Sequence, residues 1–432
     1  MMEQVICSAA RDTVLPKAAY ADAMTELHTS SGRQLVRLDA VFKANAQAEY
    51  ARLRAAGPVH RALLPSGIEG WLVVGYDEAR AALTHPALLK DPVPAAEALT
   101  AAGYILNQPG VGLGGQMLEA DPPEHTRLRR LVSAAFTPRR TAALAPRVEQ
   151  IAHELIDALP PSGETDLIDS FTAPLPVTVI AELLGIPTAD RADFRAWSSK
   201  ALEVGTDGHR EAVAGLHRLL GRLIADKRRE PADDLLSALV AARDEEDGRL
   251  SEEELVGTAL LLVVAGHETT VNLLGNGVVA LLRHPGQLRL LRERPDLLPG
   301  AVEELLRYDT SVELTTHRFA AQDLVLAGVP IPRGDVVVVS LVSASRDAPL
   351  PDGADPAALD VTRPSVRHLS FGHGIHHCLG APLARLEIQI ALRTLLHRFT
   401  RLEPTTPLDS LGWIPAGMMR GPVSLPVRYE TG

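Results

Sequence analysis

The feature that most constrains the fold is a long apolar helical pattern near the middle of the chain. Ser251 is followed by three glutamates, and Glu254 stands where the second member of a helix-starting capping box is expected. The helical pattern continues to about Leu282 and is stopped by the histidine, proline and glycine at 284–286. A helix of about thirty residues is more than twice the mean length in globular proteins, so we expect it to cross the whole core.

The remaining patterns predict a mainly α protein with a minor β portion. Asp121 and the two prolines after it are expected to cap and start one helix. Further helices are predicted at 44–56, 77–83, 121–136, 147–158, 177–184, 210–228, 298–308 and 381–399. Two strands are predicted at 59–64 and 70–74, and a third at 423–427. The segment 324–341 is predicted to form two more strands, one before and one after a turn at 330–334. No linker divides the pattern, so we expect a loose leader at 1–38 and a single catalytic domain at 39–432.

Composition narrows the class of protein and its partners. Of the 432 residues, 46% are hydrophobic and 22% are charged, which is typical of a globular protein. The formal net charge of −11 argues against general nucleic-acid binding, which needs a basic surface. The two cysteines, Cys7 and Cys378, cannot build a disulfide framework, which favours a reducing compartment. Because no signal peptide is visible and the apolar run at 255–265 is too short to span a bilayer, we expect a cytoplasmic protein that does not bind membranes.

Cys378 stands in a glycine-rich loop, where residues 371–382 read FGHGIHHCLGAP. Glycines allow tight turns, and Pro382 suits the first turn of a helix, so the cysteine is expected just before a helix N-terminus. Backbone N–H groups and the helix dipole favour a thiolate there. Three interpretations stay open from the residues alone: a buried structural cysteine, a zinc site with the loop histidines, and a nucleophile with a histidine base. The histidines are too close together for the usual spacing of zinc ligands.

This loop resembles the haem-binding loop of the cytochrome P450 superfamily, a long motif that is rarely matched by chance. The resemblance implies an α-rich prism in which the long helix passes over a haem b, beside a small β subdomain. It implies that the thiolate of Cys378 is the proximal ligand of the haem iron and that Phe371 packs near the sulfur and shields it.

Residues 265–270 read AGHETT in the middle of the predicted long helix. A zinc-protease site fails because residue 271 is valine, where a second histidine is needed, and the glycine and threonines alone could mark only a kink. The segment resembles the family's oxygen-activation motif, which implies that Ala265 and Gly266 leave room for dioxygen. It also implies that Thr269 holds a water there and that Glu268 relays protons, an acid–alcohol pair suited to proton delivery.

Glu304 and Arg307 form the commonest kind of surface helix pair, and alone they predict nothing more. In this chain they resemble the family's Glu-x-x-Arg motif, whose third member matches Arg363, and the resemblance implies a structural lock. Residues 345–347 read SRD, where the family pattern begins with asparagine.

A basic set accompanies these motifs. His125 and Arg129 stand four residues apart on one predicted helix face and can reach one carboxylate, although an ordinary basic face shows the same pattern. The resemblance implies that they contact the haem propionates together with Arg318 and His376.

The motifs follow the family's order over about residues 40–430, and the resemblance predicts a haem-thiolate monooxygenase. It would insert one oxygen atom from dioxygen into a sizeable apolar natural product, by hydroxylation or epoxidation. The sequence is most similar to family members that oxidise macrolides and similar natural products, so a macrolide or another polyketide is the expected substrate. Terpenoids and steroids stay open as substrates. Electrons are expected from a ferredoxin with an NAD(P)H-dependent reductase. The predicted docking patch, with a solvated basic face as the alternative, comprises Arg127, Arg130, Arg139 and Arg140.

The predicted pocket walls are mostly apolar, and they include the segment 90–118. The individual side chains are Thr258, Leu261, Leu262, Val312, Leu314, Ile414, Met418 and Met419. Glu313 is read either as a partner for a substrate amine or as a surface charge. Three other functions stay open: a haem-thiolate peroxygenase or oxidative-coupling enzyme, a haem sensor without turnover, and a cysteine hydrolase without haem. The pair Glu268 and Thr269 argues against the first of these.

Overall fold

A computed structural model describes the protein at residues 35–65, 67–92, 96, 116–136, 138–201, 208–244, 250–351, 353–364 and 366–432. The helices of this part are α2 (Ala40–Ala44), α3 (Ala46–Ala56), α4 (Tyr76–Thr84), α6 (Glu124–Ala135), α7 (Pro138–Ala143), α8 (Ala145–Asp157), α9 (Pro174–Leu183), α10 (Arg191–Lys200), α11 (His209–Arg229), α12 (Leu235–Asp244), α13 (Glu252–Arg283), α14 (Pro285–Glu293), α15 (Leu298–Tyr308), α16 (Leu341–Arg346) and α17 (Ala381–Arg398). The strands are β1 (Val36–Arg37), β2 (Val59–Leu63), β3 (Glu69–Val73), β4 (Leu88–Leu89), β5 (Ser162–Asp166), β6 (Arg318–Ala320), β7 (Leu324–Leu326), β8 (Val329–Ile331), β9 (Val336–Val339), β10 (Phe399–Pro404) and β11 (Pro426–Thr431). The protein is therefore mainly helical with a minor β portion, as the sequence predicted.

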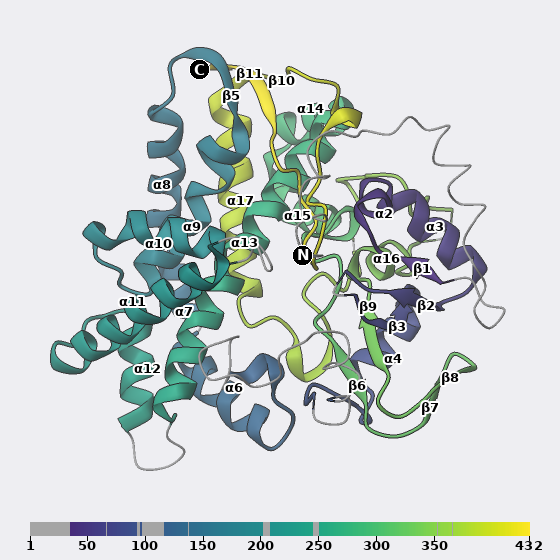
Figure 1. Ribbon diagram of the computed structural model, residues 1–432. Coiled ribbons are helices and arrows are strands. Elements are labelled where there is room, and N and C mark those ends of the chain that lie inside the picture. The colour runs from purple at the N-terminus through teal and green to yellow at the C-terminus, as the bar shows by residue number, and fades with distance from the viewer. Residues whose placement is uncertain are drawn as a thin grey trace, which may run out of the picture.

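Figure 1 shows α8 to α12 gathered on one side of the molecule, and β1 to β3 with α2 and α3 on the other.

Helix α13 is the predicted long helix, and its capping box is present. The hydroxyl of Ser251 accepts a hydrogen bond from the N–H of Glu254 (3.1 Å), and the Glu254 carboxylate accepts one from the N–H of Ser251 (2.6 Å). Within the described chain, α13 is the one helix that is long and apolar enough to cross a membrane. Most of that stretch is buried by the rest of the protein, which is the situation of a core helix.

Two hydrophobic cores meet along α13. Residues 255–264 pack in one core with α6, α9, α11 and α12. Residues 273–281 pack in a second core with α8, α15 and α17. The residues between them, which include the predicted oxygen-activation motif at 265–270, belong to neither core.

The largest sheet separates two smaller cores, and its strand order is β1-β2-β3-β9-β6-β4. The predicted hairpin is confirmed, because β2 and β3 pair antiparallel. Side chains alternate along β9: Val336 and Val338 pack with α3, and Val337 and Val339 pack with α4. Strand β6 pairs with β4, which places Arg318 beside the segment that ends in Lys90.

The boundary of the predicted leader was wrong. Val36–Arg37 forms β1 in parallel with β2, and Leu38 is buried. The chain therefore joins the fold before residue 39, while residues 1–34 of the expected leader lie outside the described residues.

Two turn and strand positions also differ from the prediction. The first turn within 324–341 lies at Ala327 and Gly328, whose φ angles of +51° and +77° are both left-handed. Pro330, which was predicted to start the turn, lies instead in β8. The alanine hid this turn, because Ala-Gly is not one of the usual turn pairs. The C-terminal strand β11 begins at Pro426, later than the predicted Val423, and pairs with β5 and β10.

Asp121 does not cap α6, which has no side-chain cap. Its carboxylate accepts hydrogen bonds from the backbone N–H groups of Lys90 (2.8 Å) and Asp91 (2.9 Å). The aspartate therefore fastens the chain after β4 to the start of α6.

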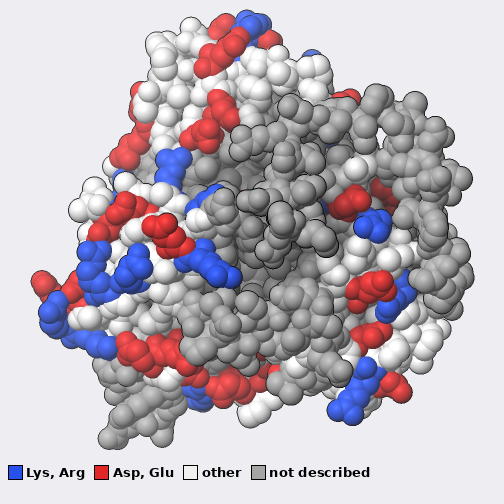
Figure 2. All heavy atoms as spheres, in the orientation of Figure 1, with Lys and Arg blue, Asp and Glu red and all other residues white. Residues whose placement is uncertain are grey.

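Charged side chains of both signs share the surface. Figure 2 shows acidic and basic groups close to one another over the described part of one face. Some form ion pairs between elements, as Arg222 does with Asp190 (2.7 Å) and Arg228 with Glu252 (2.6 Å).

Candidate active site

The cysteine loop is a tight turn fixed at the start of α17. Gly372 and Gly374 have φ angles of +73° and +77°, which residues with side chains rarely adopt. A Cβ added to Gly374 would also lie 2.9 Å from the Thr84 side chain. The N–H of Cys378 donates to the carbonyl of Phe371 (2.8 Å), and α17 begins shortly afterwards with proline in its first turn. The cysteine therefore lies directly before a helix N-terminus, as the sequence predicted.

Burial raises the pKa of the Cys378 thiol, and this is the largest effect on it. Hydrogen bonds from the N–H groups of Gly380 and Ala381, and the charges of Arg129 and Arg385, oppose this rise without cancelling it. The helix N-terminus alone therefore does not produce the predicted thiolate, whereas a metal ion on the sulfur removes the proton outright. The Cys378 side chain is accessible to solvent, although many protein atoms lie around it. Both are expected for a side chain in the wall of a hollow.

Helix α13 faces an open space at the AGHETT motif. Ala265 is exposed and Glu268 and Thr269 are half-buried, although α13 is buried on both sides of this turn. The hydroxyl of Thr269 donates to the carbonyl of Ala265 (3.0 Å), a common bond for threonine in helices. His267 is buried and its Nδ1 lies 2.7 Å from the carbonyl oxygen of Val263. Of the polar side chains in the motif, the acid and one alcohol therefore reach the open space.

Gly266 also lies against a neighbouring helix. A Cβ at this position would lie 2.9 Å from Cδ1 of Ile180 in α9. The glycine therefore lets α13 pack closely on α9. Of the two small residues, Ala265 is the one that opens on the space.

The four predicted propionate partners gather beside the cysteine loop. The rings of His125 and His376 lie 4.3 Å apart between centroids, and Arg129 and Arg318 donate to backbone carbonyls at 2.7 and 3.2 Å. Both ring nitrogens of His125, Nε2 of His376 and Nε of Arg318 are buried and have no hydrogen-bond partner among the described residues. Burial and the nearby positive charges lower the pKa of His376 to about 3. These nitrogens therefore have no acceptor among the described residues, although the charge of Asp121 acts on His125 and Arg318.

Lys90 joins this cluster, and the sequence did not predict it. The side chain is buried, and its ammonium donates to the carbonyls of Thr316 (3.3 Å) and His317 (3.2 Å). Burial and the charge of Arg318 lower the pKa of Lys90 to about 7. The only local signal was a lysine that ends an apolar run just before Asp91 and a proline.

Within the described residues, no three His, Cys, Asp or Glu side chains lie close enough together to hold a metal ion. This contradicts the zinc site that the loop histidines left open. A metal at Cys378 would therefore need ligands that the protein does not supply, such as those of a porphyrin.

The structure brings the predicted lock together. Glu304 accepts hydrogen bonds from Arg307 Nε (2.7 Å) and Nη2 (2.9 Å) and from Arg363 Nε (3.0 Å), and all three side chains are buried. Arg307 and Arg363 both also donate to the carbonyl of Ala358. The lock therefore fastens α15 to the segment that leads to the cysteine loop.

The predicted pocket walls are only partly brought together. Val312 pairs with Met419 through a β-bridge. Leu314 instead packs in the core between α3 and the large sheet, which corrects its placement. The other predicted wall residues are the buried Thr258, Leu261 and Leu262, the half-buried Ile414 and the exposed Met418. Most of the segment 90–118 lies outside the described residues.

Both predictions for Glu313 were wrong, because its carboxylate is buried and already paired. Its Oε1 accepts a hydrogen bond from the hydroxyl of Tyr50 (2.9 Å), and its Oε2 lies 3.3 Å from the ammonium of Lys43. Neither a surface charge nor a contact for a substrate amine fits this position.

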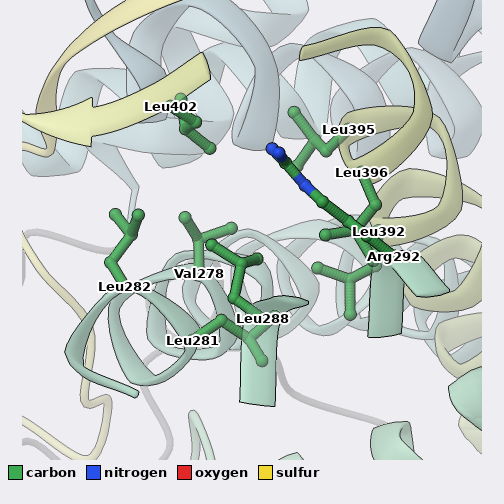
Figure 3. A pocket seen from close by; sticks show the side chains of 9 residues that line it. All are labelled: Val278, Leu281, Leu282, Leu288, Arg292, Leu392, Leu395, Leu396 and Leu402. Atoms are coloured by element: carbon green, nitrogen blue, oxygen red, sulfur yellow. The ribbon is translucent and has the colours of Figure 1, made fainter. Parts of the chain in front are cut away.

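A separate hollow lies at the far end of α13 from the motif, between α13, α14, α17 and β10. Figure 3 shows its apolar lining, which includes Val278, Leu288 and Leu402, with the stem of Arg292 alongside. Arg292 donates to the carbonyls of Phe399 (2.8 Å) and Thr400 (3.1 Å). The lining carries no carboxylate, thiol or histidine, so it offers no group for acid–base or nucleophilic chemistry.

Together these features define a mainly α protein with a cysteine ligand at a helix N-terminus and an open space at the centre of its longest helix. A model of the Cytochrome P450 family matches residues 193–426. The chain is 49% identical over 395 residues to the cytochrome P450 monooxygenase PikC of Streptomyces venezuelae, covering 90% of this chain and 92% of PikC. It is 44% identical over 384 residues to the mycinamicin IV hydroxylase/epoxidase of Micromonospora griseorubida, covering 88% and 94% of the two chains. Among solved structures, the tirandamycin C-bound P450 monooxygenase TamI matches with a TM-score of 0.82 and 43% identity, covering 91% of this chain and 99% of TamI.

The chain belongs to the cytochrome P450 family, and it is a monooxygenase that uses haem iron. The residues present fit that cofactor. A haem brings an iron that accepts one sulfur ligand and two carboxylates that accept hydrogen bonds. The accessible Cys378 and the unpartnered nitrogens of His125, His376 and Arg318 are the matching groups of the protein.

Proposed function

We propose that this monooxygenase holds haem b and hydroxylates or epoxidises a macrolide or a related polyketide. The observation that carries the cofactor assignment is the cluster of unpartnered nitrogens beside Cys378, because buried polar groups without a hydrogen-bond partner are costly. The names of two relatives support the substrate class, since one is a mycinamicin IV hydroxylase/epoxidase and the structure of the other, TamI, holds tirandamycin C.

In this proposal Cys378 ligates the iron, and Phe371 shields the sulfur from water. His125, Arg129, Arg318, His376 and Lys90 hold the two carboxylates of the cofactor, which explains why the unpartnered nitrogens of His125, His376 and Arg318 gather near the buried Lys90. The lock of Glu304 with two arginines keeps the loop in place and has no chemical role. When bound, the haem supplies the oxidising chemistry of dioxygen.

Glu268 and Thr269 are the proposed proton relay. Their side chains reach the open space at the centre of α13, whereas the neighbouring His267 and Thr270 are buried. The Thr269 hydroxyl holds a water by hydrogen bonding, and the Glu268 carboxylate passes protons inward from solvent. A positioned acid–base group of this kind contributes about 10²–10⁴-fold to a rate. Ala265 leaves space for the oxygen molecule, and Gly266 lets α13 approach α9.

The redox partners proposed are a ferredoxin and its NAD(P)H-dependent reductase, and the protein is proposed to act in the cytoplasm as one catalytic domain. Of the arginines in the predicted docking patch, Arg127 forms ion pairs with Glu124 and Glu254, while Arg130, Arg139 and Arg140 are exposed. The exposed arginines are therefore the better candidates for contacts with an acidic ferredoxin.

The test is turnover of the purified protein with a panel of macrolides and other polyketides. One series receives ferredoxin, reductase and NAD(P)H, and a parallel series receives hydrogen peroxide alone. We expect the ferric spectrum to respond to some members of the panel, and oxygenated product to form only with the electron-transfer proteins. Product from peroxide alone would instead support the peroxygenase.

The cofactor is tested separately with Cys378→Ser and Arg318→Leu. We expect Cys378→Ser to lose the red-shifted absorbance of the reduced carbon monoxide complex that sulfur-ligated iron gives. Arg318→Leu should bind ordinary haem more weakly than the wild type, yet match the wild type for haem whose carboxylates are methyl esters. An equal deficit with both forms of haem would show that Arg318 does not contact a carboxylate.

A further inference from the structure

The carboxylate of Glu268 is held by a neighbouring side chain that no motif predicted. Asn272 lies one helical turn further along α13, and its Nδ2 donates to Glu268 Oε1 (3.0 Å) and to the Glu268 carbonyl (2.9 Å). The asparagine is 4% exposed, so its amide has little contact with water. Among the described residues, Glu268 Oε2 accepts no hydrogen bond. The two carboxylate oxygens are therefore not equivalent.

The amide of Asn272 is itself fixed by the backbone that passes beside it. A Cβ added to Gly421 would lie 1.9 Å from Asn272 Oδ1, so only glycine allows this approach. The backbone there is tied down on both sides: Gly421 accepts from the N–H of Ile414 (3.0 Å), and Arg420 donates its N–H to Ser311 (2.7 Å). The backbone at Gly421 therefore packs directly against the amide that binds Glu268.

We propose that Asn272 is a positioning residue for the proton relay, and that Gly421 keeps it in place. Asn272 binds Oε1 of Glu268, which leaves Oε2 to accept a proton from solvent and pass it on. A glutamate side chain without this bond has several rotamers available, and each one that turns away interrupts the relay. The inference rests on the proposed role of Glu268 and adds the residue that orients it.

The chain offers a matched control on the same helix. Asn276 is a buried asparagine one turn after Asn272, and its Nδ2 donates to three backbone carbonyls, those of Asp309, Thr310 and Arg420. It binds no carboxylate. Both Asn272→Ala and Asn276→Ala remove a buried amide from α13, and only the first removes a hydrogen bond to the Glu268 carboxylate.

The experiment compares Asn272→Ala, Asn276→Ala, Glu268→Gln and the double variant Asn272→Ala/Glu268→Gln as haem-loaded enzymes. We expect Asn272→Ala to lower the product formed per NAD(P)H by about tenfold, a part of what a positioned acid–base group supplies. In the Glu268→Gln background the same change should add no further loss, because coupled residues are not additive. Asn276→Ala should lower the melting temperature comparably and leave the product ratio unchanged.

A second readout does not depend on turnover. Infrared difference spectra between wild type and Glu268→Gln identify the carboxylate band of Glu268, and Asn272→Ala should shift this band because Oε1 loses a hydrogen bond. An unshifted band, or an equal loss of product in the Glu268→Gln background, would overturn the positioning role while the relay stands. If Glu268→Gln itself leaves the product ratio unchanged, the proposed relay is wrong and the role of Asn272 falls with it.

Discussion

The ammonium of Lys43 lies 3.3 Å from Oε2 of Glu313, and both side chains are almost completely buried. Lys43 also donates to the carbonyls of Gly417 (2.9 Å) and Met419 (2.7 Å). The pair joins α2 near the start of the described chain to the segment of Val312, which forms a β-bridge with Met419, and to the C-terminal segment that contains Gly421. It therefore links the wall of the proposed pocket to the backbone that holds Asn272.

Removal of one member of this pair should be far more harmful than removal of both. Lys43→Met leaves Glu313 charged and buried without its cation, and we expect a loss of about 3–5 kcal/mol in the free energy of unfolding. The double variant Lys43→Met/Glu313→Gln leaves no unpaired charge and should recover most of that loss. Denaturant titrations of the single and double variants measure both values. Additive losses would show that the two side chains do not act as a pair.

Neighbouring glutamates on α15 provide a matched test of burial. Glu304 is buried against Arg307 and Arg363, whereas Glu303 is 27% exposed and binds Arg385 and His368. We expect Glu304→Gln to cost about 3–5 kcal/mol of unfolding free energy, because two buried guanidinium groups lose their anion. Glu303→Gln should cost about 1 kcal/mol or less, as for pairs near the surface.

Haem retention shows whether Glu304 holds the cysteine loop in place or only stabilises the fold. Glu304→Gln should release haem to an acceptor protein faster than Glu303→Gln does, since the lock fastens the segment before the cysteine loop. Similar rates of haem loss in the two variants would contradict a role of the lock at the cofactor.

The parts of this site that the sequence predicted have local signals. The capping box at Ser251, the glycines around Cys378 and the proline after it each act within a few residues, so a pattern reveals them. No comparable pattern marks the contacts of Lys90 or the pairing of Lys43 with Glu313, since those contacts join segments far apart in the chain. A lysine or glutamate in sequence looks the same whether its partner is water or a distant buried charge.

For some residues the sequence predicted the location correctly but not the contacts, because those contacts form only when distant segments pack together. Asp121 has the residue type and position of a helix cap, but the approach of Lys90 and Asp91 offers its carboxylate two better donors. The thiolate prediction for Cys378 allowed for the helix N-terminus and left out the larger effect of burial.

The packing role of Gly266 can be tested by a compensating change. Gly266→Ala forces a methyl group against Ile180, and we expect a loss of about 1–3 kcal/mol, reduced by about 1 kcal/mol because alanine favours helix. Ile180→Val removes the methyl group that is in the way and should restore stability in the double variant. Gly277→Ala is the control, since its added Cβ would lie 3.4 Å from Leu305, an ordinary contact.

Carbon monoxide binding to the reduced protein reports on the other role of this position. If packing is the whole reason for Gly266, the double variant Gly266→Ala/Ile180→Val should bind carbon monoxide like the wild type. Restored stability with weakened gas binding would show instead that the glycine also clears space for dioxygen.

Glu387 should make the protein less stable as the pH rises. It lies buried in α17, Oε2 has no hydrogen-bond partner among the described residues, and burial raises the pKa of its carboxyl to about 8. In the unfolded chain a glutamate has a pKa of about 4.3, so the folded protein holds a proton that the unfolded chain releases between these values. The contribution of this group to stability is therefore complete below about pH 4.3 and falls by up to about 1.4 kcal/mol per pH unit until about pH 8.

Glu387→Gln keeps the size of the side chain and removes its titration, so the free energy of unfolding of this variant should fall less steeply than that of the wild type between pH 5 and 8. Denaturant titrations at intervals of one pH unit give both slopes. The control is Glu149→Gln, which removes a half-exposed carboxylate paired with Arg393 on the surface and should leave the slope as it is in the wild type. Equal slopes for Glu387→Gln and the wild type would mean that Glu387 is already ionised in the folded protein, and a cation near α17 would then have to balance its charge.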